Sequence, residues 1–430
     1  YPMPKGKQAL AQGLLRQMWR QLRNRLGQQS VGSPVEARER SLIEECLLLH
    51  YSGILEVHAF LGNILEPAYC AIESLHLAER IQDNDRQAIG NAMMGYVFAL
   101  ISAERLSKYY FQRAKNFSVH YNQQIYYLLY KQVIGIFSLN SSKWSEATEC
   151  LSEATDICFK LGDDPLQFFS LYHQVFIEYY RGHYDEASGL LLALIDRCRR
   201  HHYERYLTWF QALQGAIQLR RGQFHQAAQC LEAAKRSMQH RQDALFDCYL
   251  GGLQALCSLR LGDEALARRQ AQETAQHMLT KRFVSHGGLE GLPGLIEVFL
   301  GLAEKSRDLG QRHALVKQAM SPLGKLKQFA GSFQIARART CHFQGRVALL
   351  QGRAREAEHH FRRGLAEAEQ SQMPYEQALA HAWLARLPRA AMSPGSQLSE
   401  SHHAALALAL FRQLHAEWDI GQLSEHSQGR

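Results

Sequence analysis

The sequence repeats a short pattern at an interval of forty residues. Residues 181–194 read RGHYDEASGLLLAL, and residues 221–234 read RGQFHQAAQCLEAA. One small residue marks the same position in every copy, and the set is Ser142, Gly182, Gly222, Gly262 and Gly352. A chain with such a period is expected to form similar units that bury their apolar faces by stacking on one another.

Each unit reads as a helix, a tight turn and a second helix. Alanine stands five residues after the marker (Ala147, Ala187, Ala227, Ala267 and Ala357), and leucine stands nine residues after three of the markers (Leu151, Leu191 and Leu231). These spacings place the small and apolar side chains on one helical face. Seven residues before the marker another small residue recurs, at Gly135, Gly215, Ala255 and Gly345. We therefore expect close helix packing within each unit and a chain reversal at each marker.

Glutamine recurs eight residues before the marker, at Gln174, Gln214, Gln254 and Gln344. A buried amide must find hydrogen-bond partners, and the turn offers backbone groups that need them. We interpret this column as architectural, with ligand contact as the alternative.

The pattern resembles the tetratricopeptide repeat, although the period is longer than that family's usual 34 residues. The resemblance implies an all-α, right-handed solenoid of helical hairpins with repeats of ~40 residues. We divide the chain into a basic amphipathic N-terminal helix at 1–30, divergent helical repeats at 34–120, regular repeats at 121–280, a degenerate repeat at 281–332, a further regular repeat at 333–372, and C-terminal capping helices with a tail at 373–430.

Within the degenerate repeat, Gly310 is the expected turn residue, and the glycine-rich stretch GLEGLPG at 288–294 starts a helix. Clustered glycines can also cradle a phosphate. No strand is expected before this stretch and no GK[ST] follows it, so a nucleotide site is not favoured.

Several longer stretches resemble the C-terminal region of large bacterial signalling ATPases that carry a class III nucleotide cyclase or a Ser/Thr kinase domain. These stretches are YPMPKGKQALAQGLLRQMWRQL at 1–22, SLHLAERI at 74–81, QGRAREAEHHFRRGLAEAEQSQMPYEQALAHAWLARL at 351–387 and ALFRQLHAEWD at 409–419. The resemblance implies a bacterial sensor or regulatory arm, with ATPase, cyclase or kinase domains upstream in the same polypeptide. The chain begins at Tyr1, which agrees with its being part of a longer protein.

Composition narrows the setting. Nine scattered cysteines without a CxxC pair are typical of a reducing compartment, and we expect a cytoplasmic protein. A net charge of +8 suits an acidic partner, whereas nucleic-acid binding is not favoured. The 21 histidines include adjacent pairs but no HExxH, and no GxSxG motif is present, so we expect neither a metal site nor a cofactor nor an enzymatic activity.

The inner face of the array is the expected binding site for a protein or peptide. Slots on the first helix of each unit place aromatic residues beside cationic ones, a combination used by peptide-binding grooves. The candidate groove residues are Phe169, Tyr172, Phe176, Tyr179, Tyr180, Trp209, Arg220, Tyr249, Arg260, Arg339, His342 and Arg346. The alternative is that the aromatic stripe is core. Burial of Tyr172 and Phe176 by more than nine tenths would exclude a groove at those positions.

The N-terminal helix has a second possible role. Residues 5–25 carry six Lys or Arg residues, and no acidic residue occurs before Glu36. A basic amphipathic helix can contact an anionic membrane surface or dock on an acidic partner. It can equally be the first helix of the stack, which is the interpretation we favour.

Three functions remain open: a non-catalytic regulatory arm that binds proteins within a signalling ATPase, a free-standing adaptor, or a solenoid of a transcription regulator that senses a small-molecule inducer. The last predicts a closed and largely apolar pocket, and the first two predict an open groove.

Overall fold

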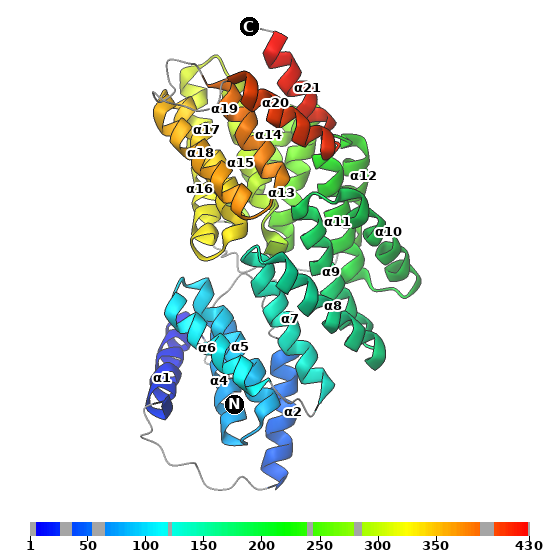
Figure 1. The fold of residues 1–430 in the computed structure, drawn as a ribbon, viewed down its shortest axis with the longest axis vertical. Helices are drawn as coiled ribbons and strands as arrows, with labels where there is room; N and C mark the ends of the chain where they lie inside the picture. The colour runs from blue at the N-terminus through cyan, green and yellow to red at the C-terminus, as the bar shows by residue number, and fades with distance from the viewer. Residues whose placement is uncertain are drawn as a thin grey trace. The chain divides into compact units, whose positions relative to one another are not determined.

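The computed structural model describes residues 6–25, 37–53, 65–118, 123–238, 244–278, 286–387 and 400–428. These residues form twenty α-helices and two short 3₁₀ helices and contain no strand, which confirms the all-α class (Figure 1). The chain forms two compact units. Unit 1 is Tyr1–Leu139 with Trp144–Ser170, and unit 2 is Asn140–Lys143 with Leu171–Arg430.

Unit 1 contains α1 (Lys7–Arg25), α2 (Ala37–Gly53), α4 (Leu65–Arg80), α5 (Asn84–Leu100), α6 (Glu104–Phe117), α7 (Gln124–Asn140) and α8 (Trp144–Leu161). Its core is built from buried side chains such as Leu75, Ile89 and Tyr126, and Leu14 and Met18 of α1 pack against this core. Leu15 and Trp19, on the same helix, remain 66% and 61% exposed. Helix α1 is therefore part of unit 1, and it also presents apolar side chains to solvent.

Helix α9 (Asp164–Arg181) contributes to both units. Unit 2 continues with α10 (Tyr184–Arg200), α11 (Glu204–Arg220), α12 (Phe224–Ser237), α13 (Ala244–Arg260), α14 (Glu264–Met278), η2 (His286–Gly288), α15 (Gly291–Lys305), α16 (Leu309–Ser332), η3 (Gln334–Ala336), α17 (Arg337–Leu350), α18 (Ala354–Gln370), α19 (Pro374–Arg386), α20 (Glu400–Gln413) and α21 (Glu417–Gln428). Adjacent helices pack in pairs, as α11 with α12, α13 with α14 and α17 with α18 do. None of the described helices is long and apolar enough to cross a membrane.

The five marker residues all lie in turns between helices and have positive φ angles, from 56° at Ser142 to 91° at Gly262. At Gly182 the backbone N–H donates to the carbonyl of Tyr179, and the next N–H, of His183, donates to Glu178. This is the hydrogen-bond pattern of a helix that ends in a left-handed residue. The turns predicted from the sequence are confirmed.

Left-handed turn residues also occur midway between the markers and before them, at Gln82, Ser102, Gly162 and His202. Gln82, Ser102, Ser142, Gly162, Gly182, His202, Gly222 and Gly262 thus fall on one grid of twenty or forty residues. The regular spacing therefore extends into the stretch 34–120 that the sequence marks as divergent. It escapes notice there because the turn residues are not glycines.

The small residues before the markers receive a side chain of the paired helix. A Cβ added at Gly135 would lie 2.7 Å from Leu151, and one at Gly215 would lie 2.8 Å from Leu231. At Gly345 the neighbour is Phe361, at 2.4 Å. Since real Cβ contacts are longer than 3 Å, a Cβ at these positions would force the neighbouring side chain to shift.

The glycine-rich stretch at 288–294 serves helix packing. A Cβ at Gly252 of α13 would lie 2.1 Å from the carbonyl oxygen of Gly291, and one at Gly294 would lie 2.4 Å from that of Gly252. These glycines let the backbones of α13 and α15 approach. The expected turn at Gly310 is wrong: Gly310 lies in the first turn of α16, where its N–H donates to the capping carboxylate of Asp308.

The glutamine column is not solvent-exposed. Gln214 is 5% exposed, and Gln174, Gln254 and Gln344 are half-buried. The Gln214 amide donates to the hydroxyl of Ser188 on α10 at 2.8 Å, rather than to a backbone group at the turn. Its partner is thus the neighbouring helix.

The C-terminal helices return to early turns of unit 2. A Cβ at Gly182 would lie 2.4 Å from Leu414, at the end of α20, and one at Gly222 would lie 2.9 Å from the backbone nitrogen of Trp418 in α21. The segment that contains α20 and α21 therefore covers the turns at residues 182 and 222.

Candidate ligand-binding cavity

A cavity of about 520 Å³ lies within unit 2. Its walls come from one helix of each successive pair, namely α9, α11, α13, α15, α17 and α19, with Phe411 of α20 and Trp418 of α21 closing one side. Five arginines and four carboxylates line it: Arg220, Arg260, Arg339, Arg346, Arg386, Glu290, Glu297, Glu304 and Asp419. We call it the charged cavity.

The first charge cluster consists of Arg220, Arg339, Glu290 and Glu376. Arg220 Nη2 lies 3.3 Å from carboxylate oxygens of both Glu290 and Glu376. Arg339 makes a close ion pair with Glu376 and lies 3.8 Å from Glu290. Two arginines thus face two glutamates, and the four charges balance.

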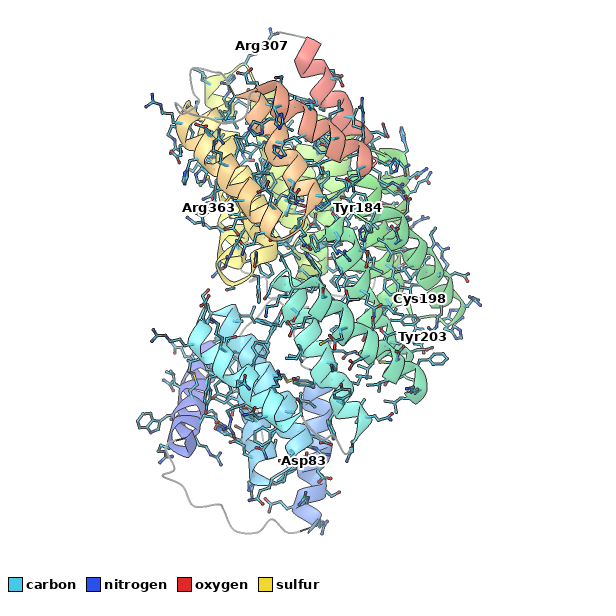
Figure 2. All side chains as sticks on the ribbon, in the orientation of Figure 1. Asp83, Tyr184, Cys198, Tyr203, Arg307 and Arg363 are labelled. Atoms are coloured by element: carbon cyan, nitrogen blue, oxygen red, sulfur yellow. The ribbon has the colours of Figure 1, made fainter. Side chains whose placement is uncertain are left out.

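Tyrosines surround this cluster. The Tyr179 hydroxyl donates to Glu290 at 3.0 Å, and Arg220 donates to the hydroxyl of Tyr184, labelled in Figure 2, at 3.5 Å. The Arg220 guanidinium also lies between two rings, 4.4 Å from the centre of Tyr179 and 4.3 Å from that of Tyr375. These contacts compensate the desolvation of the guanidinium.

The second charge cluster consists of Arg260, Arg346, Arg386, Glu297, Glu304 and Asp419. Arg346 binds Glu304 through two parallel contacts of 2.9 and 3.0 Å and makes a further close ion pair with Glu297. Arg260 reaches Glu297 at 3.1 Å. Glu290, the N-cap residue of α15, and Glu297 and Glu304 within the helix are spaced seven residues apart and so lie along one face.

Two tryptophans form the aromatic walls of this cluster. The Arg260 guanidinium lies 3.4 Å from the ring centre of Trp418, and Arg346 and Arg386 each lie 5.0 Å from that of Trp383. An arginine stacked on an indole keeps its in-plane N–H groups available to acceptors.

The carboxyl groups of this cluster differ in their proton affinity. Burial would raise the pKa of Glu297, but Arg346 and Arg260 outweigh it and lower that pKa to about 2. Burial raises the pKa of Asp419 to about 6, against the opposing influence of Arg260 and of the hydrogen bond from Tyr375. Near neutral pH Glu297 is therefore fully charged, whereas Asp419 can change its charge.

His342 faces the cavity with an unused polar atom. It is 6% exposed, and its Nδ1 atom has no hydrogen-bond partner within the described part of the chain. Burial and the nearby Arg346 hold its pKa well below the usual value, so the ring is neutral. A buried imidazole nitrogen of this kind is suited to a ligand hydrogen bond.

The structure divides the twelve predicted groove residues into two sets. Six line the charged cavity: Tyr179, Arg220, Arg260, Arg339, His342 and Arg346. The others, Phe169, Tyr172, Phe176, Tyr180, Trp209 and Tyr249, are buried, each less than 5% exposed. For Phe169, Tyr180, Trp209 and Tyr249, a role in partner binding stays a prediction.

An open groove is excluded at Tyr172 and Phe176. Tyr172 is 4% exposed and Phe176 is 0% exposed. Tyr172 packs edge-on against Phe176 and Trp209, and Phe176 packs edge-on against His286. His286 in turn hydrogen-bonds His173 at 3.0 Å and Asn140 at 2.9 Å. The stripe is therefore an aromatic core, because η2 and neighbouring helices cover it.

Sequence reasoning identified none of the acidic residues that line the cavity. Glu290, Glu297 and Glu304 interrupt an otherwise apolar helix at a spacing of seven, and Arg339 and Arg346 share this spacing. Carboxylates in such a stripe would be buried and would need cationic partners, which was a usable signal. Nothing local indicates that Trp418 and Asp419 complete the same cavity.

Among the described residues, no group of three or more His, Cys, Asp or Glu side chains is arranged to hold a metal ion, and all nine cysteines are free thiols. No protein-family model and no curated protein sequence matches the chain.

Proposed function

We propose that this chain is a non-catalytic sensor arm that binds a small molecule in the charged cavity of unit 2. The supporting observation is a cavity of about 520 Å³ with buried polar groups converging on it. Small-molecule sites in proteins are concave, span ~300–1,000 Å³, and orient the ligand with a few placed polar groups.

The position of the cavity suggests how occupancy could be transmitted. Its wall residues are distributed from Tyr179 to Gln422, so a ligand would touch helices of six successive pairs together with α21. A ligand that binds one arrangement of these helices better than another shifts the population toward it. The resemblance to signalling ATPases supports the same reading, in which upstream catalytic domains would respond to that shift.

The charged lining distinguishes this proposal from a sensor with an apolar pocket. Arginine and glutamate side chains, rather than leucine and phenylalanine alone, face the space. Apolar inducers would leave these groups desolvated without new partners, so a polar ligand is the better match.

The test is co-purification. Native mass spectrometry and small-molecule extraction are applied to the purified chain and to Ala382→Trp, which places an indole in the cavity from α19. We expect a bound small molecule in the unchanged protein and its loss in Ala382→Trp. Leu309→Trp, at a site 65% exposed on α16, is the matched control and should retain the ligand.

A cavity without a ligand in the unchanged protein, combined with no thermal stabilisation by any member of a metabolite collection, would contradict the sensor function. Equal ligand content in Ala382→Trp and in the unchanged protein would move the binding site elsewhere.

A protein-binding role has separate support in unit 1. Leu15, Trp19, Leu106 and Tyr109 are each more than 40% exposed and line one groove of about 570 Å³ between α1 and α6. Exposed basic residues flank them on the same helices, Arg16 and Arg20 on α1 and Arg105 and Lys108 on α6. This combination suits an amphipathic helix with acidic flanks.

In-cell cross-linking with mass spectrometry tests this second role. The double variant Leu15→Asp/Trp19→Asp should lose a cross-linked protein that the unchanged chain captures, because two like-charged acids would face the partner. Lys327→Gln, exposed on α16, serves as the control. If the double variant captures the same protein as the unchanged chain, this groove is not a partner site. If the unchanged chain captures no protein but binds anionic vesicles, and the double variant does not bind them, the groove contacts a membrane surface.

A further inference from the structure

We propose that the ligand of the charged cavity is a small organic carboxylate with a flat apolar portion, held by the second charge cluster between Trp383 and Trp418. This inference rests on the proposed sensor function and adds the chemical class of the ligand.

The charge count of the cavity points to a single negative charge. The first cluster is balanced, with Arg220 and Arg339 against Glu290 and Glu376. The second cluster has three arginines, Arg260, Arg346 and Arg386, against Glu297, Glu304 and Asp419. Three arginines therefore face three carboxylates, of which Asp419 has a pKa raised toward neutrality. Lys305 also lines the cavity, but its ammonium group pairs with Glu264 at 2.7 Å. When Asp419 is protonated, the second cluster carries one uncompensated positive charge.

Asp419 can become protonated when an anionic ligand binds. Its carboxylate accepts a hydrogen bond from Tyr375 at 3.2 Å, and the charged groups that act on it are Arg260, Arg220, Glu297 and Arg386. Because its pKa is raised to about 6, the cost of protonating it near neutrality is small. A ligand carboxylate can thus supply the negative charge beside the arginines while Asp419 is protonated.

The walls indicate the rest of the ligand. Trp383 and Trp418 line the cavity with arginine guanidinium groups over their rings, and the neutral His342 ring lies 6.0 Å from that of Trp383, edge to face. A flat group can pack against these stacked guanidinium and indole groups, and Nδ1 of His342 supplies one directional hydrogen bond. A carboxylate is favoured over a phosphate monoester because the latter carries nearly two charges at neutral pH, more than the cluster leaves uncompensated.

Titration calorimetry on the full chain tests the assignment with a matched pair of probes, indole-3-acetate and the neutral indole-3-acetamide, and with inorganic phosphate. We expect the acetate to bind about tenfold or more tightly than the acetamide at about pH 5. Its affinity should fall about tenfold on raising the pH to about 8, as Asp419 becomes charged. In Asp419→Asn this pH dependence should disappear, and in Arg386→Gln the preference for the acetate should be lost.

Several outcomes would overturn the assignment. These are equal affinity for acetate and acetamide, an affinity for the acetate that rises with pH, or no heat with the acetate at about 10 mM. Tighter binding of phosphate than of the carboxylate would replace the proposed ligand class by a phosphate. The pH series needs only the unchanged protein, so it remains decisive if Arg386→Gln does not fold. A neutral ligand that co-purifies with the protein and leaves with Ala382→Trp would preserve the sensor function while refuting the anion.

Discussion

At the residue scale, the turn glycines of unit 2 have two separate reasons to be glycine. All have positive φ angles, which side chains with a Cβ disfavour. Gly182 and Gly222 are also covered by the C-terminal helices, whereas a Cβ at Gly262 or Gly352 would meet open space. The same φ therefore carries a different packing constraint at each site.

We predict that Gly222→Ala destabilises unit 2 more than Gly262→Ala. Both lose about 1–2 kcal/mol from the left-handed backbone. Only Gly222→Ala places its Cβ about 3 Å from Trp418, so α21 must shift. Urea unfolding measures the difference. Equal losses in the two variants would show that α21 does not pack against this turn in solution.

A second residue-scale prediction concerns Asp419. Because the folded pKa of about 6 lies above the ordinary aspartate value of 3.8, the folded state holds the proton more tightly, and stability is lost as pH rises between these values. Asp419→Asn removes this loss. Its unfolding free energy should match that of the unchanged protein below about pH 4 and exceed it by roughly 2–3 kcal/mol above about pH 7. Denaturant unfolding across this range decides the matter, and a constant difference at all pH values would contradict the prediction.

At the scale of elements, the helix pairs and their turns follow from the sequence, whereas the acidic stripe of α15 depends on its partners. Small residues before the markers and leucines after them determine the local packing, because both lie within one helix pair. Glu297 becomes a buried anion only where Arg260 and Arg346 from two other helices converge on it. Contacts between different helix pairs are therefore harder to predict from the sequence than contacts within one helix pair.

The contact between α13 and α15 gives a prediction at this scale. Gly252→Ala should destabilise the protein by about 2 kcal/mol or more, because the added methyl meets backbone rather than a movable side chain. Gly324→Ala, in the interior of α16 with no atom within 4 Å, should instead stabilise by about 0.5–1 kcal/mol. Thermal unfolding of the pair is the measurement. A mild effect of Gly252→Ala would mean that the two helices lie farther apart.

At the scale of the whole molecule, the sequence predicts the helical class, and half of the twelve predicted groove residues line the cavity. Tyr179, Arg220, Arg260, Arg339, His342 and Arg346 were identified because a repeat places equivalent positions on one face. That Trp418 and Asp419 close one side of the cavity could not be predicted from the sequence, because no periodic signal links α21 to helices some two hundred residues earlier. Burial of the aromatic stripe was likewise hidden, because His286 and η2 come from outside the regular repeats.

The return of α21 predicts a long-range response within unit 2. Trp418→Ala removes the stacking on Arg260 and the cover over Gly222. Hydrogen exchange should therefore become faster at the turn around residue 222 and at the end of α13, and should stay unchanged in α4 and α5 of unit 1. Faster exchange confined to α21 itself would indicate that this helix does not support the turn.

Because α21 lies near the C-terminal end of the sequence, it is synthesised after the helices that it covers. Residue 418 is added to the chain 196 positions after residue 222. At roughly 5–20 residues per second, the ribosome needs about 10–40 s for that distance, whereas helices form within microseconds. During synthesis the guanidinium of Arg260 therefore lacks the cover of Trp418 until α21 is added. A ligand or chaperone can reach that guanidinium before the cavity wall is complete.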